Sequence, residues 1–152
     1  MPSIYYLINQ LSLDYPNINF IIDKNFSWSR VESSVHYVDK SEMWPMLIHE
    51  IAHHELDHSN YKNALHLLNM ERDAWIKAIE IAKKYDLKID NDVIESSLDS
   101  YRDWVHNRSK CPECNAIGVE ISKNYYQCIQ CDNYWKVNDA RQCGLKRYKI
   151  TK

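Results

Sequence analysis

Four cysteines arranged as two C-x-x-C pairs place the tightest constraint on how this chain can fold. Cys111 and Cys114 form the first pair, and Cys128 and Cys131 follow after thirteen intervening residues. Four thiolates at this spacing are typical of a closed tetrahedral zinc site, which stabilises a small fold and leaves no position for catalysis. Two disulfides are the alternative, but the chain starts without a recognisable secretory leader, which favours a reducing, cytoplasmic setting. Cys143 is left over and is predicted to be a free thiol.

The charge of the chain is unevenly distributed around these cysteines. Residues 109–152 hold eight Lys/Arg and four Asp/Glu, whereas the rest of the chain has a net charge of −6. We therefore expect two domains, residues 1–108 and a zinc ribbon with a basic tail at 109–152. A basic ribbon is compatible with nucleic-acid binding, and also with a charged surface that only keeps the ribbon in solution. No apolar run approaches the ~18 residues of a membrane span.

A second motif, H-E-x-x-H, lies at residues 49–53 between apolar neighbours. On a helix, positions i and i+4 share a face, so His49 and His53 can direct both imidazoles at one metal ion. Zn²⁺ accepts imidazole nitrogen readily, and Glu50 would then lie beside the ion, able to take a proton from water. A solvated His/Glu face is the alternative, but apolar flanking residues predict a buried helix, on which such groups need partners or a metal.

A catalytic zinc site needs a third protein ligand, and Glu71 is the best candidate. It lies in the middle of the apolar stripe of the following helix, where a lone carboxylate is costly unless it is paired or bound to metal. If the buried stripe is rotated from this assignment, Glu71 is exposed. Asp73 is the rival, although pairing with Lys77 one turn later is its simpler role. The stripe consists of Ala64, Leu67, Leu68, Ala74, Trp75, Ala78, Ile79 and Ala82.

The other histidines lack the spacing of primary ligands. His58 follows His53 by five residues, and His54 points about 100° away from it around the helix. His66 borders the apolar stripe, and no spacing argument applies to His36 or His106.

The pattern of apolar and capping residues predicts an α+β fold. Ser41 is expected to cap the helix that carries the H-E-x-x-H motif, with Pro45 tolerated in its first turn. Strands are expected at 18–22 and 33–39, and helices at 3–13, 41–58, 62–85 and 92–107.

With His49, Glu50, His53 and Glu71 in place, residues 18–85 resemble the gluzincin-type peptidases, and most closely the ImmA/IrrE-like metallopeptidases. In that family a second helix carries E-x-x-A, matched here by Glu71 to Ala74. The resemblance implies a minimal zincin-like domain with a small sheet and three main helices. It also implies that His49, His53 and Glu71 bind zinc and that Glu50 is the general acid/base. The segment 33–39 would be the strand that pairs with an extended protein or peptide substrate.

The chain departs from that family in its C-terminal part. Its cysteine ribbon replaces the DNA-binding helix-turn-helix of many members, and the pairing with H-E-x-x-H is similar to SprT-like proteases, which are the second choice. Those proteases use a third histidine, and here only His58 is near. We expect a zinc metallopeptidase with one catalytic and one structural Zn²⁺. The alternatives are a non-catalytic ribbon adaptor that binds nucleic acid or protein, or a SprT-like, DNA-associated protease. Tyr61, Tyr101 and His106 are unassigned candidates for stabilising an oxyanion.

Overall fold

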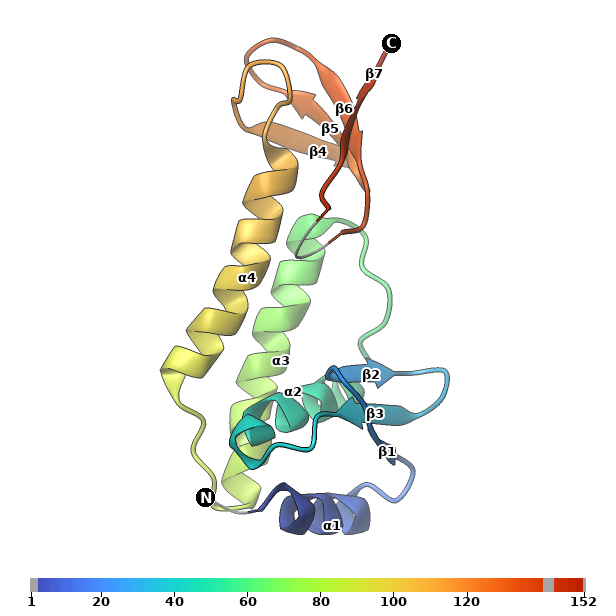
Figure 1. Cartoon of the computed structure of the whole chain (residues 1–152), viewed down its shortest axis with the longest axis vertical. Helices are drawn as coiled ribbons and strands as arrows, with labels where there is room; N and C mark the ends of the chain where they lie inside the picture. Colours follow the sequence, from blue (N-terminus) through green and yellow to red (C-terminus); the bar gives the residue numbers. More distant parts are fainter. Residues whose placement is uncertain (1–2, 141–143, 152) are drawn as a thin grey trace. The chain divides into compact units, whose positions relative to one another are not determined.

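The fold was described from a computed structural model, which covers residues 3–140 and 144–151. Cys143 therefore lies outside the described residues. In the described ranges four α-helices combine with two small sheets, which confirms the predicted α+β class (Figure 1). The elements are α1 (Ile4–Asp14), β1 (Asn19–Ile22), β2 (Ser27–Ser29), β3 (Ser34–Tyr37), the 3-10 helix η1 (Ser41–Met43), α2 (Trp44–Glu55), α3 (Ala64–Lys84), α4 (Asn91–Ser109), β4 (Gly118–Ser122), β5 (Tyr125–Cys128), β6 (Tyr134–Val137) and β7 (Arg147–Ile150).

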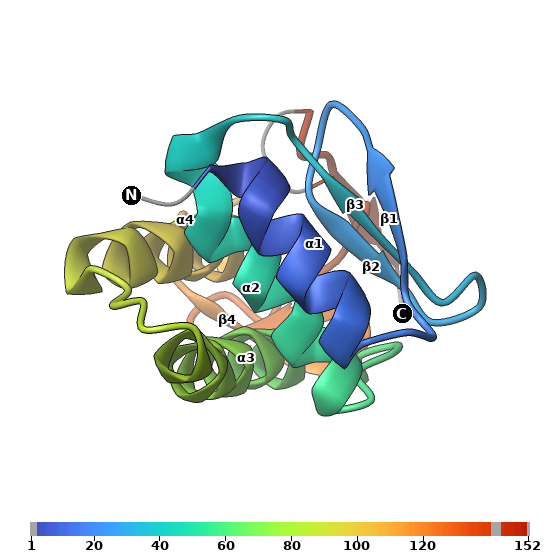
Figure 2. The same ribbon diagram turned by 90° about the horizontal axis from the view of Figure 1, so that it is seen from below.

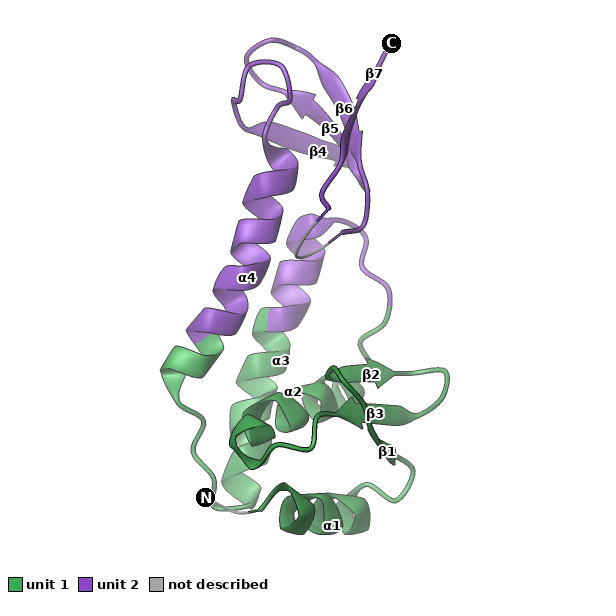
Figure 3. Ribbon diagram, viewed as in Figure 1, with its two compact units in different colours: residues 1–59, 72–94 green, residues 60–71, 95–152 purple. Residues whose placement is uncertain are grey.

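These elements form two compact units, coloured separately in Figure 3. Unit 1 comprises residues 1–59 and 72–94, and unit 2 comprises residues 60–71 and 95–152. The division thus falls within α3, between Glu71 and Arg72, and again near the start of α4. The predicted domain division between residues 108 and 109 stays a prediction.

Unit 1 contains α1, α2 and a three-stranded sheet with the strand order β1-β3-β2 (Figure 2). α1 buries Ile4, Leu7 and Leu11, which recur at helical spacing on one face. β3 pairs in parallel with β1 and antiparallel with β2, and α2 packs against β2 and β3. Fully buried residues of α2 form the centre of this core, namely Leu47, Ile48, Ile51 and Ala52.

The start of α2 differs from the prediction at Ser41. This residue opens the short 3-10 helix rather than capping α2, and Met43 precedes the α-helix without a side-chain cap. The hydroxyl of Ser41 instead accepts a hydrogen bond from the backbone N–H of Ile4 at 3.2 Å, so it satisfies a donor at the start of α1. Pro45 lies in the first turn of α2, as predicted, where a proline removes no intrahelical hydrogen bond.

Unit 2 joins helical segments to a four-stranded antiparallel sheet in the order β4-β5-β6-β7. Ala64, Leu67 and Trp104 form one buried cluster, against which Tyr61 and Tyr101 pack. Arg108, at the end of α4, is fully buried, with its guanidinium 4.1 Å from the centre of the Trp104 ring. The segment that joins α4 to the ribbon is therefore packed rather than exposed as a linker.

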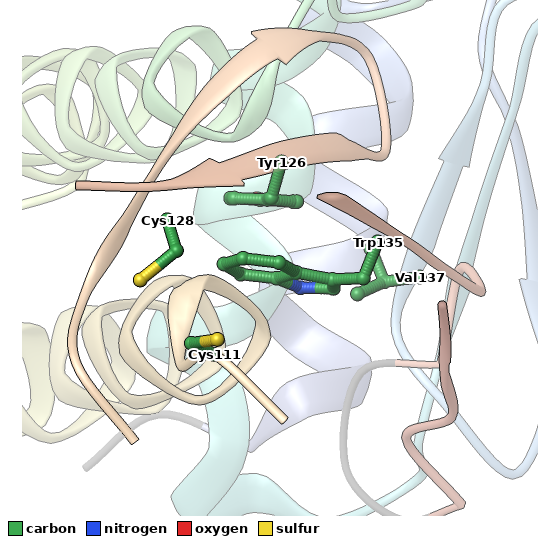
Figure 4. Close-up of a cluster of buried hydrophobic side chains, with 5 residues drawn as sticks. All are labelled: Cys111, Tyr126, Cys128, Trp135 and Val137. Carbon is green, nitrogen blue, oxygen red and sulfur yellow. The ribbon is translucent and has the colours of Figure 1, made fainter. Parts of the chain in front are cut away.

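The ribbon has its own aromatic core, drawn in Figure 4. The rings of Tyr126 and Trp135 stack with 5.5 Å between their centres, and the indole N–H of Trp135 donates to the backbone oxygen of Arg108. Gly118 lies against this indole so closely that an added Cβ would be 2.3 Å from Trp135 Cη2 and 2.7 Å from the backbone oxygen of Gln127. A glycine is required there because the backbone and the indole are almost in contact.

Across the described ranges, every helix is too short or too polar to cross a lipid bilayer.

Candidate metal centres

The first centre is built on α2, whose buried face carries both histidines of the H-E-x-x-H motif. His49 is 2% exposed and His53 is 8% exposed, and their Nε2 atoms face each other at 3.1 Å. Two nitrogens bound to one zinc ion at 2.0–2.1 Å in tetrahedral geometry lie about 3.3–3.4 Å apart. The helix therefore presents the two ring nitrogens at nearly the separation that a shared ion requires, as the i, i+4 spacing predicts.

Glu71 joins these two histidines. Its side chain is only 5% exposed, which confirms the burial predicted from the apolar stripe of α3. One ligand atom from each of His49, His53 and Glu71 lies within 4.8 Å of the others. α3 continues without interruption from Glu71 to Trp75, one turn later, whose indole stacks on the His49 ring with 4.2 Å between centres. The apolar stripe predicts Trp75 in the core, but the stripe alone does not indicate this contact with a candidate ligand.

Glu50 follows His49 on α2 and is 9% exposed, so its carboxyl group is largely shielded from bulk water. It is not one of the three grouped ligands, because residues i and i+1 of a helix point about 100° apart. A carboxylate that lies beside the metal ligands without binding the metal is suited to exchange protons with water. A carboxylate that binds the metal is less free to do so.

Asp73 and His54, which were weighed as other ligands, contact other residues. The carboxylate of Asp73 is half-exposed and accepts hydrogen bonds from Arg72, and the predicted pairing with Lys77 is wrong because that ammonium binds Glu55 and Glu80. The His54 ring packs on Trp28 of β2 with 4.7 Å between centres. Among the described residues, therefore, the group contains two histidines and one glutamate.

The strand next to the motif does not have the role that the resemblance implied. Residues 33–39 were expected to pair with an extended substrate, but β3 is central and its main chain is paired on both sides. The free edge nearest α2 belongs to β2, which packs on that helix through Trp28 and His54. β2 was not among the predicted strands, because its three residues, Ser27 to Ser29, contain a single apolar side chain.

The second centre consists of Cys111, Cys114, Cys128 and Cys131, whose sulfur atoms all lie within 4.8 Å of one another. The Cys111–Cys131 and Cys114–Cys128 sulfur distances are 3.7 and 3.5 Å. A disulfide requires about 2.05 Å, whereas sulfurs bound at 2.3 Å to one tetrahedral ion lie about 3.8 Å apart. The four thiols are therefore reduced and spaced as a metal site would hold them, and the disulfide alternative is wrong.

The two C-x-x-C turns repeat the same backbone pattern. The N–H of Cys111 donates to the oxygen of Ala116, and the N–H of Cys128 donates to Asn133, again five residues on. The residue after each second cysteine, Asn115 or Asp132, has a positive φ of 62° or 60°. Asn and Asp tolerate this left-handed conformation better than most residues.

These turns direct backbone N–H groups at sulfur. Glu113 donates to Cys111 Sγ at 3.4 Å, and Gln130 and Cys131 donate to Cys128 Sγ at 3.3 and 3.4 Å. The hydrogen bonds from the backbone of Cys131 and Gln130 lower the pKa of the Cys128 thiol to about 6. The turns thus favour the thiolate at the first cysteine of each pair, Cys111 and Cys128, and the thiolate is the form that binds a metal.

Comparisons of the chain with family models, with curated proteins and with solved structures give no match.

Proposed function

We propose that the chain is a zinc-dependent metallopeptidase of the ImmA/IrrE-like type, with His49, His53 and Glu71 as ligands of a catalytic zinc ion. The observation that carries the proposal is the buried convergence of two imidazoles and one carboxylate, with Glu50 beside them. Three protein ligands are typical of catalytic zinc sites, whereas structural sites have four. The four-cysteine group is of that second kind and supports the assignment of one catalytic and one structural ion.

Zinc at this site would polarise the scissile carbonyl group and lower the pKa of a bound water to about 7. Glu50 would accept a proton from the attacking water and donate it to the amide nitrogen as the C–N bond breaks. The water oxygen ends on the new carboxyl group, and the proton ends on the new amine. The shielded position of Glu50 supports this role, because a carboxyl shielded from bulk water would exchange its proton with groups inside the site.

The edge of β2 is the proposed docking site for the substrate main chain. An extended peptide adds to an exposed sheet edge by main-chain hydrogen bonds, and β2 is an edge strand packed on the helix that carries the ligands.

Hydrolysis of a denatured protein substrate by the zinc-loaded chain tests the proposal. Glu50→Gln should lower kcat by roughly 10²–10⁴-fold, the usual contribution of a general acid/base, without loss of bound zinc. The matched control is Glu42→Gln, which removes an exposed carboxylate near the start of the same helix. Equal rates for the Glu50 variant and the wild type would remove Glu50 from the mechanism.

The outer face of the ribbon sheet favours a second function, binding of single-stranded nucleic acid. Cross-strand pairing aligns Tyr125, Lys136 and Tyr148 in one row on the face opposite the buried Trp135. Tyr125 is 37% exposed and Tyr148 is 51% exposed. An apolar depression of about 180 Å³ adjoins the row and is lined by Ile121, Tyr125, Tyr126, Tyr134, Ile150 and Thr151.

Exposed aromatic rings with nearby lysines suit stacked bases and phosphates, and the net charge of +4 on residues 109–152 complements a nucleic-acid backbone. Binding of a fluorescent oligo-dT should weaken roughly 5- to 150-fold in Tyr148→Ala, equivalent to 1–3 kcal/mol per stacked base. Tyr5→Ala, at an exposed tyrosine of α1, is the control. Failure of the wild-type chain to bind at low salt would exclude this function.

A further inference from the structure

α2 ends in a Schellman motif, and this motif determines what lies behind the ligand His53. The N–H of Asp57 donates to the oxygen of His54, and the N–H of His58 donates to the oxygen of His53, both at 3.0 Å. Asp57 has a φ of +52°, the left-handed conformation that the motif requires at its first residue beyond the helix. The motif folds the next residue, His58, back against the helix at His53.

In most Schellman motifs these two side chains make an apolar contact, but here both are imidazoles. The Nδ1 atoms of His53 and His58 lie 2.8 Å apart, and the ring centres are 5.0 Å apart. A nitrogen–nitrogen distance of this length between neutral rings requires one N–H to donate to the lone pair of the other.

The direction of this hydrogen bond follows from the other side of the His53 ring. His53 Nε2 faces His49 Nε2 in the candidate metal site, so Nε2 must offer its lone pair there whenever a metal ion is bound. The proton of the neutral His53 ring is then on Nδ1, and Nδ1–H donates to Nδ1 of His58. A metal-binding histidine is generally held in this way by an acceptor at its second nitrogen.

We propose that His58 is a positioning residue, which accepts the Nδ1 proton of His53 and thereby fixes both the tautomer and the orientation of this ligand. The inference rests on the metal site of the proposed function, but not on hydrolysis. The turn that terminates α2 therefore also supplies the hydrogen-bond acceptor for His53. Arg30, which follows β2, contacts the Asp57 carboxylate at 2.9 Å and so holds the residue whose left-handed conformation makes this turn.

Two substitutions separate the hydrogen bond from the packing. His58→Leu keeps a side chain that can pack against His53 but removes the acceptor. His58→Asn places an amide oxygen near the former Nδ1 position and restores an acceptor. A merely structural role would make leucine the milder change, whereas the positioning role makes asparagine the milder one.

Co²⁺ titration of the full-length chain measures both metal sites at once, because thiolate-bound Co²⁺ has charge-transfer absorption that a His/Glu site lacks. His58→Leu should weaken binding at the His/Glu site 10- to 100-fold, as loss of an outer hydrogen-bond partner does, and leave the four-cysteine site unchanged. His58→Asn should recover most of the affinity. Unchanged affinity in His58→Leu would overturn the inference.

Imidazole ¹⁵N NMR of the metal-free chain provides a test that does not depend on metal binding. The wild type should show His53 protonated at Nδ1, and His58→Leu should show a mixture of tautomers. If the wild type binds Co²⁺ only at the cysteines, the proposed function fails. If the His53 tautomer is the same in both proteins, the role of His58 fails.

Discussion

Replacement of Glu71 by glutamine should remove most of the stability that zinc adds to the folded chain. Glu71 is 5% exposed, and a carboxylate buried to this extent carries a desolvation cost that only a positive partner or a metal offsets. Glutamine has nearly the same shape but no charge. Unfolding with a chelator present gives the metal-free stability of each protein, and the response to zinc is measured against it.

The two proteins should differ in how much zinc stabilises them. Zinc at about 100 times the dissociation constant of the His/Glu site stabilises the wild type by about 2.7 kcal/mol. Loss of a direct ligand should weaken binding at least as much as the roughly 100-fold upper limit for outer-shell partners. The zinc contribution then falls to about 0.4 kcal/mol. The difference of about 2.3 kcal/mol corresponds to a Tm lower by roughly 5–9 °C for a chain of this size.

Thermal unfolding at matched zinc concentrations, with the four-cysteine site filled in every protein, measures this difference. Asp73→Asn is the matched control, since it removes a half-exposed carboxylate from the same helix and tests the rival ligand. If zinc raises the Tm of Glu71→Gln as much as that of the wild type, Glu71 is not a ligand. If Asp73→Asn loses the response instead, the ligand was assigned to the wrong turn of α3.

Two further predictions concern the core and the helix end. Gly118→Ala should destabilise the ribbon by about 1–3 kcal/mol in urea denaturation, because the added Cβ would be 2.3 Å from a buried indole. This loss of stability should be smaller in a Trp135→Phe background. An equal loss in that background would mean that the added Cβ clashes with another group. At Glu55, burial raises the carboxyl pKa, but hydrogen bonds from Tyr15 and Lys77 outweigh it and hold the pKa below its usual 4.5. Because a lowered folded-state pKa gives stability that is present above about pH 4.5 and lost as pH falls, Tyr15→Phe should cost about 1 kcal/mol at pH 7. The cost should decrease towards pH 3.5, and a pH-independent cost would contradict this coupling.

The parts of the site that depend on helical spacing could be predicted from the sequence. His49 and His53 share a face because they are four residues apart, and Glu71 lies between apolar residues of one stripe, so its burial followed from periodicity. The cysteine pairs were predictable for a similar reason, since their spacing matches a local turn. In each case the relevant geometry lies within one element.

The parts that depend on tertiary pairing or on unusual backbone conformations could not be predicted. Whether β3 is central or at an edge depends on β2, whose three residues carry too little pattern to be recognised. His58 lacked ligand spacing, and its contact with His53 depends on the left-handed conformation of Asp57. Aspartate tolerates the left-handed conformation but adopts other backbone conformations more often, so the sequence alone does not reveal the turn.

The backbone hydrogen bonds to sulfur have a consequence for which substitutions the ribbon tolerates. In both cysteine turns one donor is the main chain two residues after the first cysteine, at Glu113 and Gln130, and both side chains are exposed. These side chains can therefore be substituted widely, but proline at either position would remove the backbone N–H that donates to sulfur. The position just before is free of this restriction, and the chain already carries Pro112 there.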